Sequence, residues 1–321
     1  MVSFAPASGR ILRMPEWLQE YGVVLVLGVL ALVATLISPA FLSPDNLSNL
    51  LRQTAPLMIV ALGQTFVILA GGIDLSVGML IGLVTVLGNG IMDGRPELAI
   101  PVVLLGLVLG LGVGVFNGLV VTLARIDPLI LTFGMLSVLQ GAIFMYTDRT
   151  IGIAPENFKQ IAYGSLGPLP VPGVLAACLT ALSWLVLART PFGRYVYALG
   201  GSEVSARRAG INTGLVKFMV YVISGLSAGI AGLVVAARLG SGYTLAGSGF
   251  ELDAIVAVVL GGTSLAGGRG GVLRTIVGVL ILGILSNMLN LGGVSSFVQQ
   301  IVKGVVVIGA VAAYTSRGRR F

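Results

Sequence analysis

The stretch PVVLLGLVLGLGVGVFNGLVVTL, residues 101–123, contains no charged residue and decides the fold. A helix of about 20 apolar residues crosses the hydrocarbon core of a bilayer, so this stretch predicts a membrane-spanning helix. The rest of the chain has the same character. Of 321 residues, 56% are hydrophobic and 10% are charged, and the mean hydropathy is +1.03. Because soluble domains carry about 25% charged residues, the chain is predicted to be an all-α integral membrane protein.

Further apolar stretches predict about ten transmembrane helices with glycine-rich packing. The candidate spans are residues 21–38, 50–70, 73–92, 97–124, 129–146, 168–188, 215–239, 251–262, 271–290 and 297–315. The eighth is short and is expected to be a broken or re-entrant segment. The first reads as a retained signal-anchor helix, and a cleaved signal peptide ending near Ser38 is the alternative.

This pattern predicts a single transmembrane permease domain over residues 21–315. A cytoplasmic N-terminal segment, 1–20, precedes the domain, and a basic cytoplasmic tail, 316–321, follows it. The longest cytoplasmic connection is the loop 189–214. No stretch of the sequence suggests a separate soluble domain.

The basic residues predict the orientation of these spans, because Lys and Arg favour cytoplasmic loops. An even number of spans puts both termini on one side. With the termini cytoplasmic, thirteen of the 19 basic residues lie inside, Lys303 lies within the last span, and five lie outside: Arg52, Arg95, Arg149, Lys159 and Arg238. Both termini are therefore predicted to be cytoplasmic. The net charge of +7 then follows from topology and from contact with membrane lipid, and no nucleic-acid partner is expected.

Composition also excludes most enzyme chemistry. The chain has no histidine and one cysteine, Cys178, which rules out histidine acid–base catalysis, histidine metal sites and an internal disulfide. The run Gly267–Gly271 is glycine-rich but lacks the Lys-Ser/Thr ending of a phosphate-binding loop. Within the spans only Asp74 and Lys303 are candidate titratable groups, in distant segments. No catalytic residue, metal site or cofactor is predicted in this chain.

Glycine spacing predicts close helix packing. Gly106, Gly110, Gly114 and Gly118 recur every four residues in one span, and Gly225 and Gly229 repeat that spacing in another. Such stripes of small residues let helix backbones approach closely in lipid. Sliding of helices in a moving transporter is the alternative reason for the pattern.

The loop between the sixth and seventh spans predicts a short capped helix. Ser202 is a suitable N-cap, Glu203 follows in the first turn, Arg207 and Arg208 occupy the last turn, and Gly210 can end the helix in a left-handed conformation. Glu203 and Arg207 are also an i, i+4 ion pair. Such a charged surface helix is suited to a groove on a soluble partner. Contact between its arginines and anionic lipid is the alternative.

Asp74 is the one carboxylate predicted inside the first three spans. A carboxylate at mid-membrane costs roughly 2.5 to 3.5 kcal/mol on insertion scales, so it usually faces a cavity or a partner. In an ion-coupled transporter it would bind the coupling ion. The preferred hypothesis is that Asp74 lies near the cytoplasmic end of the second span and caps the third helix, where the flanking Gly71, Gly72 and Gly78 let the backbone break.

Three stretches carry a resemblance to a known family: AGGIDLSVG at 70–78, the loop 193–212, and VLGGTSLAGGRGG at 259–271. In this order and spacing they resemble the permease subunit of bacterial ABC importers for monosaccharides, the ribose, xylose, galactose and autoinducer-2 group of the branched-chain amino acid and sugar permease superfamily. The resemblance covers about residues 45–313. It implies a multi-pass permease dimer in the bacterial cytoplasmic (inner) membrane. Sugar would come from a periplasmic binding protein, and a separate cytoplasmic ABC ATPase would bind ATP and Mg and drive transport.

The resemblance also implies roles for particular residues. The loop helix would be the coupling helix that contacts the ATPase, through Gly201, Ser202, Glu203, Ala206, Arg207, Arg208, Ala209, Gly210 and Ile211. A structural motif would comprise Gly71, Gly72, Asp74, Ser76, Gly78, Gly261 and Gly262. A sugar path should be lined by neutral polar and aromatic side chains, for which the candidates are Gln64, Phe66, Asn117, Phe133, Gln140 and Asn287. For each amide, a hydrogen bond between helices is the alternative role.

Two functions therefore follow from the sequence. The preferred one is the permease subunit of an ABC importer, moving a monosaccharide by alternating access. The alternative is a stand-alone secondary transporter that uses Asp74 to couple transport to an ion gradient. The two differ in whether transport needs a partner ATPase.

Overall fold

The structure, a computed structural model, describes residues 16–295, 297–302 and 304–306. Its α-helices are α1 (Glu16–Ile37), α2 (Pro44–Leu69), α3 (Val77–Met92), α4 (Ala99–Leu119), α5 (Pro128–Tyr146), α6 (Glu156–Tyr163), α7 (Val171–Arg189), α8 (Pro191–Gly201), α9 (Glu203–Arg208), α10 (Thr213–Leu239), α11 (Phe250–Leu260) and α12 (Val272–Leu291). Residues 297–302 and 304–306 are also helical. Short elements are the 3-10 turns η1 (Pro39–Leu42) and η2 (Pro96–Leu98), the π-helical turn η3 (Val120–Ala124), and the paired strands β1 (Ser165–Leu166) and β2 (Leu169–Pro170).

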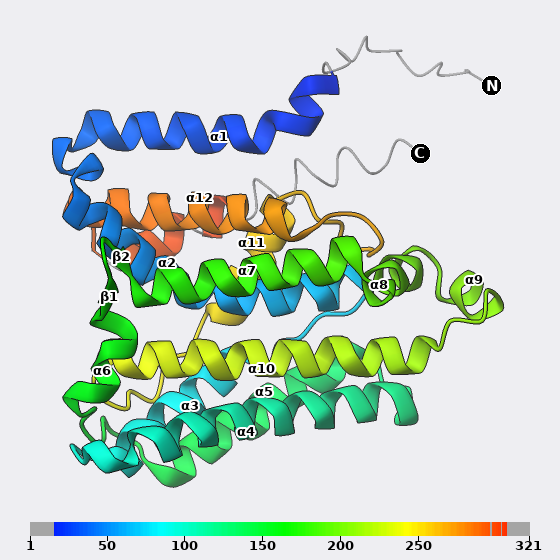
Figure 1. Cartoon of the computed structure of the whole chain (residues 1–321), viewed down its shortest axis with the longest axis horizontal. Coiled ribbons are helices and arrows are strands. Elements are labelled where there is room, and N and C mark those ends of the chain that lie inside the picture. Colours follow the sequence, from blue (N-terminus) through cyan, green and yellow to red (C-terminus); the bar gives the residue numbers. More distant parts are fainter. Residues whose placement is uncertain (1–15, 296, 303, 307–321) are drawn as a thin grey trace, which may run out of the picture.

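The long helices lie roughly side by side in a bundle (Figure 1). Helix α6 and the two strands lie at one end of the bundle, and α8 and α9 lie at the other. These two ends are called the α6 end and the α9 end below. Almost every long helix therefore connects one end to the other.

Six helical stretches are long and apolar enough to cross a membrane: Pro44–Leu69, Pro96–Ala124, Pro128–Tyr146, Val171–Arg189, Thr213–Leu239 and Val272–Leu291. Each agrees with a predicted span, most closely Pro96–Ala124 and Pro128–Tyr146, which each differ from the prediction by one residue at one end. The apolar part of α1, together with α3, α11 and the helical residues after 296, is shorter. A multi-pass membrane protein is thus confirmed, and the count of ten stays a prediction. The predicted tail, 316–321, and most of the predicted segment 1–20 lie outside the described residues.

Helices α3 and α11 begin inside the bundle after non-helical segments. The predicted third span, 73–92, is helical only from Val77, because Gly71, with φ +83°, ends α2 and the chain returns in a non-helical conformation. The predicted short eighth span is α11, which has 11 residues. The starts of the two helices adjoin, since a Cβ on Gly247 would overlap the carbonyl oxygen of Gly78.

The two glycine stripes predicted from the sequence pack against each other. A Cβ added to Gly110 of α4 would lie 2.6 Å from the carbonyl oxygen of Gly225 on α10, and one added to Gly229 would lie 2.6 Å from that of Gly106. Backbone atoms occupy this space, so no side chain fits. The predicted close packing of helices is therefore confirmed for α4 and α10.

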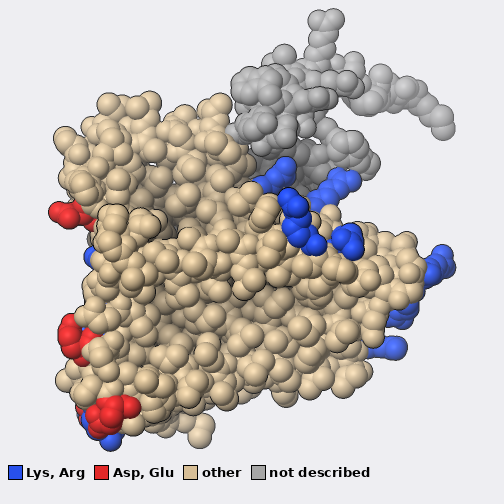
Figure 2. All heavy atoms as spheres, in the orientation of Figure 1, with Lys and Arg blue, Asp and Glu red and all other residues tan. Residues whose placement is uncertain are grey.

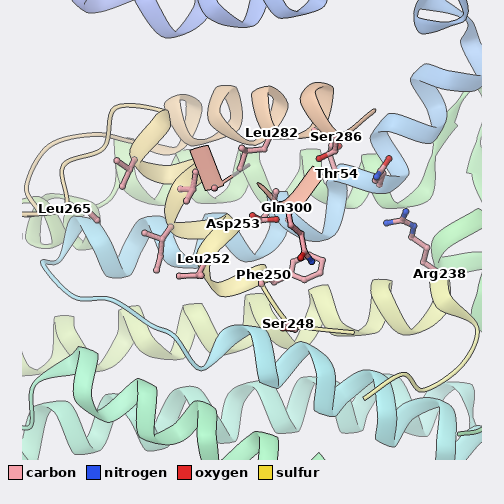
Figure 3. Close-up of a pocket in the computed structure, with 18 residues that line it drawn as sticks. Thr54, Arg238, Ser248, Phe250, Leu252, Asp253, Leu265, Leu282, Ser286 and Gln300 are labelled. Atoms are coloured by element: carbon pink, nitrogen blue, oxygen red, sulfur yellow. The ribbon is translucent and has the colours of Figure 1, made fainter. Parts of the chain in front are cut away.

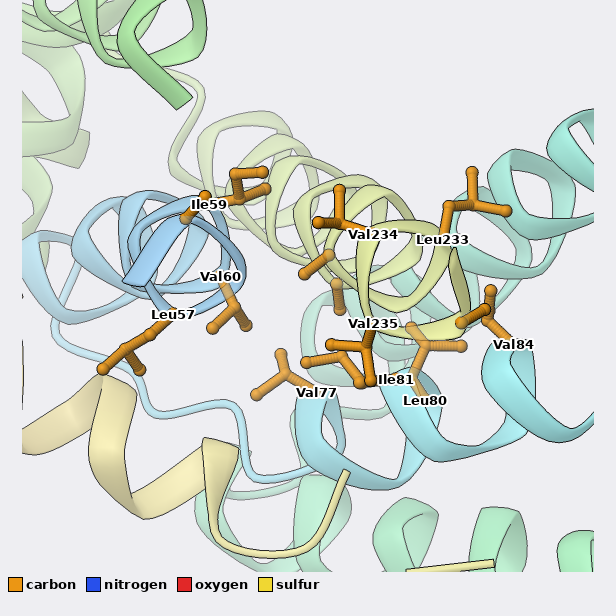
Figure 4. Close-up of a cluster of buried hydrophobic side chains, with 14 of the residues drawn as sticks. Leu57, Ile59, Val60, Val77, Leu80, Ile81, Val84, Leu233, Val234 and Val235 are labelled. Atoms are coloured by element: carbon orange, nitrogen blue, oxygen red, sulfur yellow. The ribbon is translucent and has the colours of Figure 1, made fainter. Parts of the chain in front are cut away.

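The main hydrophobic core lies between α2, α3 and α10 (Figure 4). Val60, Ile81 and Val235 meet there from the three helices and are nearly fully buried. Helices α5 and α7 are largely exposed along their length instead. The buried helices α2 and α10 thus form the centre around which the others pack.

Charge is divided between the two ends of the bundle. Figure 2 shows most of the visible Lys and Arg side chains toward the α9 end and the visible Asp and Glu side chains at the α6 end. The wide band between the ends carries neither kind on this face. This is the distribution that the sequence predicted for a protein with its basic loops on one side of a membrane.

Candidate transport site

The non-helical segment before α3 is held inside the bundle by side chains from several helices. The Thr132 hydroxyl of α5 accepts a hydrogen bond from the N–H of Leu75 at 3.1 Å. It donates to the carbonyl oxygen of Pro128 in its own helix at 2.8 Å and lies 3.3 Å from that of Ile73. The hydroxyl of Tyr221 on α10 lies 3.5 Å from the same carbonyl oxygen. Buried backbone groups without a helical partner need such bonds. These contacts therefore allow the chain to break inside the protein.

Asp74, 1% exposed, lies at the centre of this segment. Its Oδ1 accepts from the N–H of Ser76 at 3.0 Å and from the Ser76 hydroxyl at 2.6 Å, and its Oδ2 accepts from the hydroxyl of Ser224 at 2.8 Å. Ser76 is the N-cap residue of α3. The carboxylate thus bonds the residue just before the helix, close to the predicted capping role, and also ties it to α10.

Two of the predicted path residues belong to the same network. The Gln64 amide, in the orientation that satisfies both groups, donates to the carbonyl oxygen of Asp74 and accepts from its N–H, each at 3.2 Å. Asn117 donates from Nδ2 to the hydroxyl of Ser76 at 3.0 Å. Both residues are fully buried. The Gln64 amide and the Nδ2 of Asn117 therefore bond this segment, whereas the Oδ1 of Asn117 has no hydrogen-bond partner among the described residues. A role of either residue in the sugar path stays a prediction.

The other predicted path residues do not come together. Asn287 exchanges amide hydrogen bonds with Asn46, at 2.9 and 3.0 Å, and so joins α12 to α2. Phe66 is buried and stacks on Phe192, with ring centroids 6.4 Å apart. Phe133 is 59% exposed on α5, and Gln140 is half-buried on the same helix. A role of these residues in transport stays a prediction.

Sequence reasoning missed the face of α10 that contacts this network. Lys217, Tyr221 and Ser224 follow one another at spacings of four and three, so they lie on one face of the helix. Lys217 bonds Glu203 of α9, Tyr221 approaches Ile73, and Ser224 bonds Asp74. The helical spacing of these polar residues was the signal that could have found them.

Helix α9 has the local structure that was predicted. The Ser202 hydroxyl accepts from the N–H of Ser205 at 3.2 Å, which confirms the N-cap, and Gly210 has φ +82° after the last turn. Ala206 is buried against the protein, and Arg207 and Arg208 are exposed. Val204 is 63% exposed. The helix therefore presents one apolar side chain and two arginines at this end of the bundle.

Glu203 fastens α9 to α10. Its carboxylate lies 2.7 Å from Nζ of Lys217 and 3.3 Å from the guanidinium of Arg207, the predicted i, i+4 partner. The hydrogen bond from Lys217 holds the pKa of the Glu203 carboxyl below its ordinary value. An ionised Glu203 therefore links the loop helix to the long helix that contacts Asp74.

The three stretches that carried the family resemblance meet at the base of α9. A Cβ on Gly267 would lie 3.1 Å from the backbone nitrogen of Gly71 and 3.0 Å from Cα of Gly200. A Cβ on Gly268 would lie 2.8 Å from the nitrogen of Gly201, and the N–H of Gly268 donates to Leu69 of α2 at 3.0 Å. Three backbones are thus stacked where side chains would not fit.

Two glycine pairs of the structural motif, Gly71-Gly72 and Gly261-Gly262, end helices in the same way. Gly71 and Gly262 have left-handed backbones, with φ +83° and φ +90°. In both cases the N–H of the left-handed glycine donates to the carbonyl oxygen three residues before it, and the N–H of the next residue donates to the carbonyl oxygen five residues before that residue. This is the Schellman pattern of helix C-termini. The two pairs therefore end α2 and α11.

A hollow of about 720 Å³ lies between α2, α11 and α12 (Figure 3). Polar side chains on its wall are Gln53, Thr54, Arg238, Ser248, Asp253, Ser286 and Gln300. Apolar ones are Leu57, Phe250, Leu252, Ile255, Val256, Val259, Leu265 and Leu282. The six predicted path residues are not among those that line it. Its volume is typical of sites for small molecules, which are roughly 300 to 1,000 Å³.

Comparison with known proteins identifies the family. The model for the permease component of the branched-chain amino acid transport system matches residues 46–311. The ribose import permease protein RbsC of Bacillus subtilis (strain 168) is 44% identical over 299 residues, which is 92% of each chain. RbsC of Escherichia coli (strain K12) is 43% identical over 310 residues, covering 95% of this chain and 96% of the relative.

A more distant relative is the galactose/methyl galactoside import permease protein MglC of Escherichia coli (strain K12), 34% identical over 316 residues, with 92% and 94% of the two chains covered. No solved structure matches the chain. The match covers all three glycine-rich stretches, α9 and the helices that form the hollow. The chain therefore belongs to the family of permease components of branched-chain amino acid transport systems.

Proposed function

We propose that the chain is the membrane permease subunit of an ABC importer for a monosaccharide. The observation that carries this proposal is the identity of 43 to 44%, over more than nine-tenths of the chain, to proteins named as ribose import permeases. The chain supplies the path across the membrane. ATP and Mg are bound and ATP is hydrolysed in a separate ATPase subunit.

The proposed topology has ten spans with both termini in the cytoplasm of the cell and the α9 end of the bundle on the cytoplasmic side of the inner membrane. The concentration of arginines near that end supports this orientation (Figure 2), because basic residues favour the cytoplasmic side. The shorter helices α1, α3 and α11 and the helical residues after 296 supply the four spans beyond the six long ones.

Helix α9 is the proposed contact with the ATPase. Its exposed Val204, Arg207 and Arg208 supply an apolar contact and two positive charges. Glu203, bound to Lys217, makes α9 and α10 move together. The periplasmic binding protein would dock at the opposite α6 end, and two copies of the permease would form the transport unit.

The test is capture of the tagged permease from its native membranes in mild detergent, followed by an ATP hydrolysis assay of the eluate. The variant Arg207→Glu/Arg208→Glu reverses both exposed charges of α9 and leaves the Glu203–Lys217 pair in place. We expect an ATPase to elute with the wild type and to be lost from this variant, because both arginines leave the proposed contact surface. Thermal unfolding of the two proteins verifies that the variant is folded.

Arg149→Glu is the matched control, since Arg149 is 89% exposed on a loop at the opposite end. It should retain the ATPase. A folded wild type that elutes without an ATPase would overturn the proposal. An ion-coupled carrier would then be indicated if sugar uptake stopped when ionophores collapse the ion gradients and persisted when ATP is removed.

A further inference from the structure

We propose that the hollow of about 720 Å³ between α2, α11 and α12 is the passage of the sugar, and that Gln53, Ser286 and Gln300 on its wall are the side chains that bind it. This inference rests on the proposed function of the chain as a sugar permease. It assigns the passage to residues different from those that the sequence suggested. These three residues are called the polar wall below.

The hollow extends along the direction in which a substrate must travel. Arg238, in the last turn of α10, lies at one end of it, and Leu265, in the loop between α11 and α12, lies at the other (Figure 3). The first of these positions is at the α6 end of the bundle and the second is at the α9 end. The hollow therefore reaches from the α6 end of the bundle toward the α9 end.

The polar wall has hydrogen-bonding capacity that the protein does not use. The side chains of Gln53, which is half-buried, Ser286, which is buried, and Gln300, which is exposed, form no hydrogen bond with another described residue. The amides of Gln64 and Asn287, in contrast, are bonded within the protein. A sugar could bind those amides only by leaving their present partners unpaired in a buried site, which is unfavourable.

The chemistry of the polar wall suits a neutral sugar. An amide offers donors and acceptors together, and a hydroxyl offers both, so each side chain can match a sugar hydroxyl in either role. Phe250 adds an aromatic surface to the same wall. A monosaccharide carries no charge, and neither do the three residues of the polar wall. The charged side chains on the lining are Arg238, at the α6 end of the hollow, and Asp253, which already has an interaction of its own.

The remainder of the hollow, toward the α9 end, is apolar. Beyond Asp253 on α11, Val259 and Leu265 line it there. A sugar that enters this part loses hydrogen bonds to water and gains none in return. The apolar part is therefore the barrier on the cytoplasmic side. Leu265 is carried by the loop whose glycines stack on Gly200 and Gly201, directly before α9, so movement of α9 can move the barrier.

The experiment compares Gln53→Leu/Ser286→Ala with Thr85→Val in the importer reconstituted in proteoliposomes with its ATPase and its binding protein loaded with ribose. The assembled importer is needed because Leu252 on the rim is 60% exposed, so a single chain leaves one flank of the hollow open. Thr85 is a buried polar residue of α3 away from the hollow and bonds a carbonyl of its own helix at 2.8 Å. Ribose uptake and ATP hydrolysis are measured on the same vesicles.

We expect the double variant to transport at least tenfold less ribose per ATP hydrolysed, with ATP hydrolysis stimulated as in the wild type, because α9 is unchanged. Thr85→Val should behave as the wild type in both assays. Unchanged ribose uptake in the double variant, or an equal loss in Thr85→Val, would overturn the assignment. If the proposed function itself were wrong, the wild type would show no ATP-driven ribose uptake, which distinguishes that failure from a wrong assignment of the passage.

A second measurement keeps the assignment testable if the double variant does not fold. In a Cys178→Ser background, Ser286→Cys should react with a membrane-impermeant methanethiosulfonate reagent during ATP turnover, and the reaction should stop ribose uptake. Thr85→Cys should stay unlabelled and active. Labelling of Thr85→Cys at the same rate, or no labelling of Ser286→Cys from either side, would contradict a water-filled passage at this wall.

Discussion

At the scale of single residues, the polar side chains inside this membrane protein divide into those that hold the fold and those that remain unpaired. Asp74 and Gln64 belong to the first kind, because both bond within the segment before α3 or to it. Such bonds between helices are common in membrane proteins. Gln53 and Ser286 belong to the second kind and face the hollow. A buried polar residue in a transporter is therefore judged by whether it already has a partner.

Asp74 gives a prediction at this scale. Asp74→Ala leaves the N–H and hydroxyl of Ser76 and the hydroxyl of Ser224 without their acceptor, at roughly 1 to 3 kcal/mol for each buried group left unsatisfied. Asp74→Asn keeps an oxygen for Ser76 and can donate to Ser224. We expect thermal unfolding in detergent to occur at a clearly lower temperature for the alanine variant, and ATP-driven sugar uptake to survive in the asparagine variant.

The comparison of these two variants also separates the two functions that the sequence allowed. A structural carboxylate tolerates asparagine, whereas an ion-coupling site needs the ionisable group. An Asp74→Asn protein that unfolds at the wild-type temperature but does not transport would contradict the structural role.

At the scale of elements, the closest helix packing in the bundle's centre is between α4 and α10, where glycines from both helices meet. Gly225 faces the carbonyl oxygen of Gly110 and the backbone of Gly114. Backbone atoms cannot turn aside as a long side chain can. The spacing of the two helices is therefore set by the absence of side chains at these positions.

We expect Gly225→Ala to lower stability, because its Cβ would overlap the backbone of α4. Overpacking of this kind typically costs about 1 to 3 kcal/mol. Gly112→Ala is the matched control on α4, since an added Cβ there meets nothing within 4 Å. It should leave stability unchanged or raise it, as alanine favours helices by up to about 1 kcal/mol over glycine. Thermal unfolding of the two variants in detergent tests this. Equal decreases in unfolding temperature would show that the α4–α10 contact tolerates side chains.

At the scale of the whole molecule, charge sets how the bundle sits in the membrane. Helix α9 with its arginines lies at one end, and α6 with the two short strands lies at the other (Figure 1). In a membrane, the basic end is expected in the cytoplasm. The same orientation places the end of the hollow near Arg238 toward the periplasm.

Cysteine labelling tests this orientation. In a Cys178→Ser background, Leu166→Cys in β1 should react with an impermeant maleimide added to spheroplasts, and Val204→Cys in α9 should react only in inside-out vesicles. Both positions are more than 60% exposed, so each reagent reaches its target from the proper side. Both variants should react after the membrane is dissolved in detergent. The reverse pattern of labelling would invert the proposed topology.

Sequence by itself determined the class of protein, the six long helices and the local structure of α9. Hydropathy over about 20 residues is a property of one segment, and a cap such as Ser202 depends on its immediate neighbours. The glycine stripes were predictable for a similar reason, because their spacing lies within one helix. The meeting of three glycine-rich stretches at the base of α9 could not be derived from their spacing in the chain.

Only the tertiary structure decided which polar residues are paired and where the hollow lies. Asn46 and Asn287 are 241 residues apart in the chain and form hydrogen bonds with each other. The sequence therefore could not show that the Asn287 amide already has a hydrogen-bond partner. The wall formed by Gln53, Ser286 and Gln300 likewise depends on which faces of α2, α12 and the last helical residues adjoin. The physical reason is that a side chain's free hydrogen-bonding capacity depends on contacts between segments that are distant in the chain, whereas hydropathy and capping depend on neighbours.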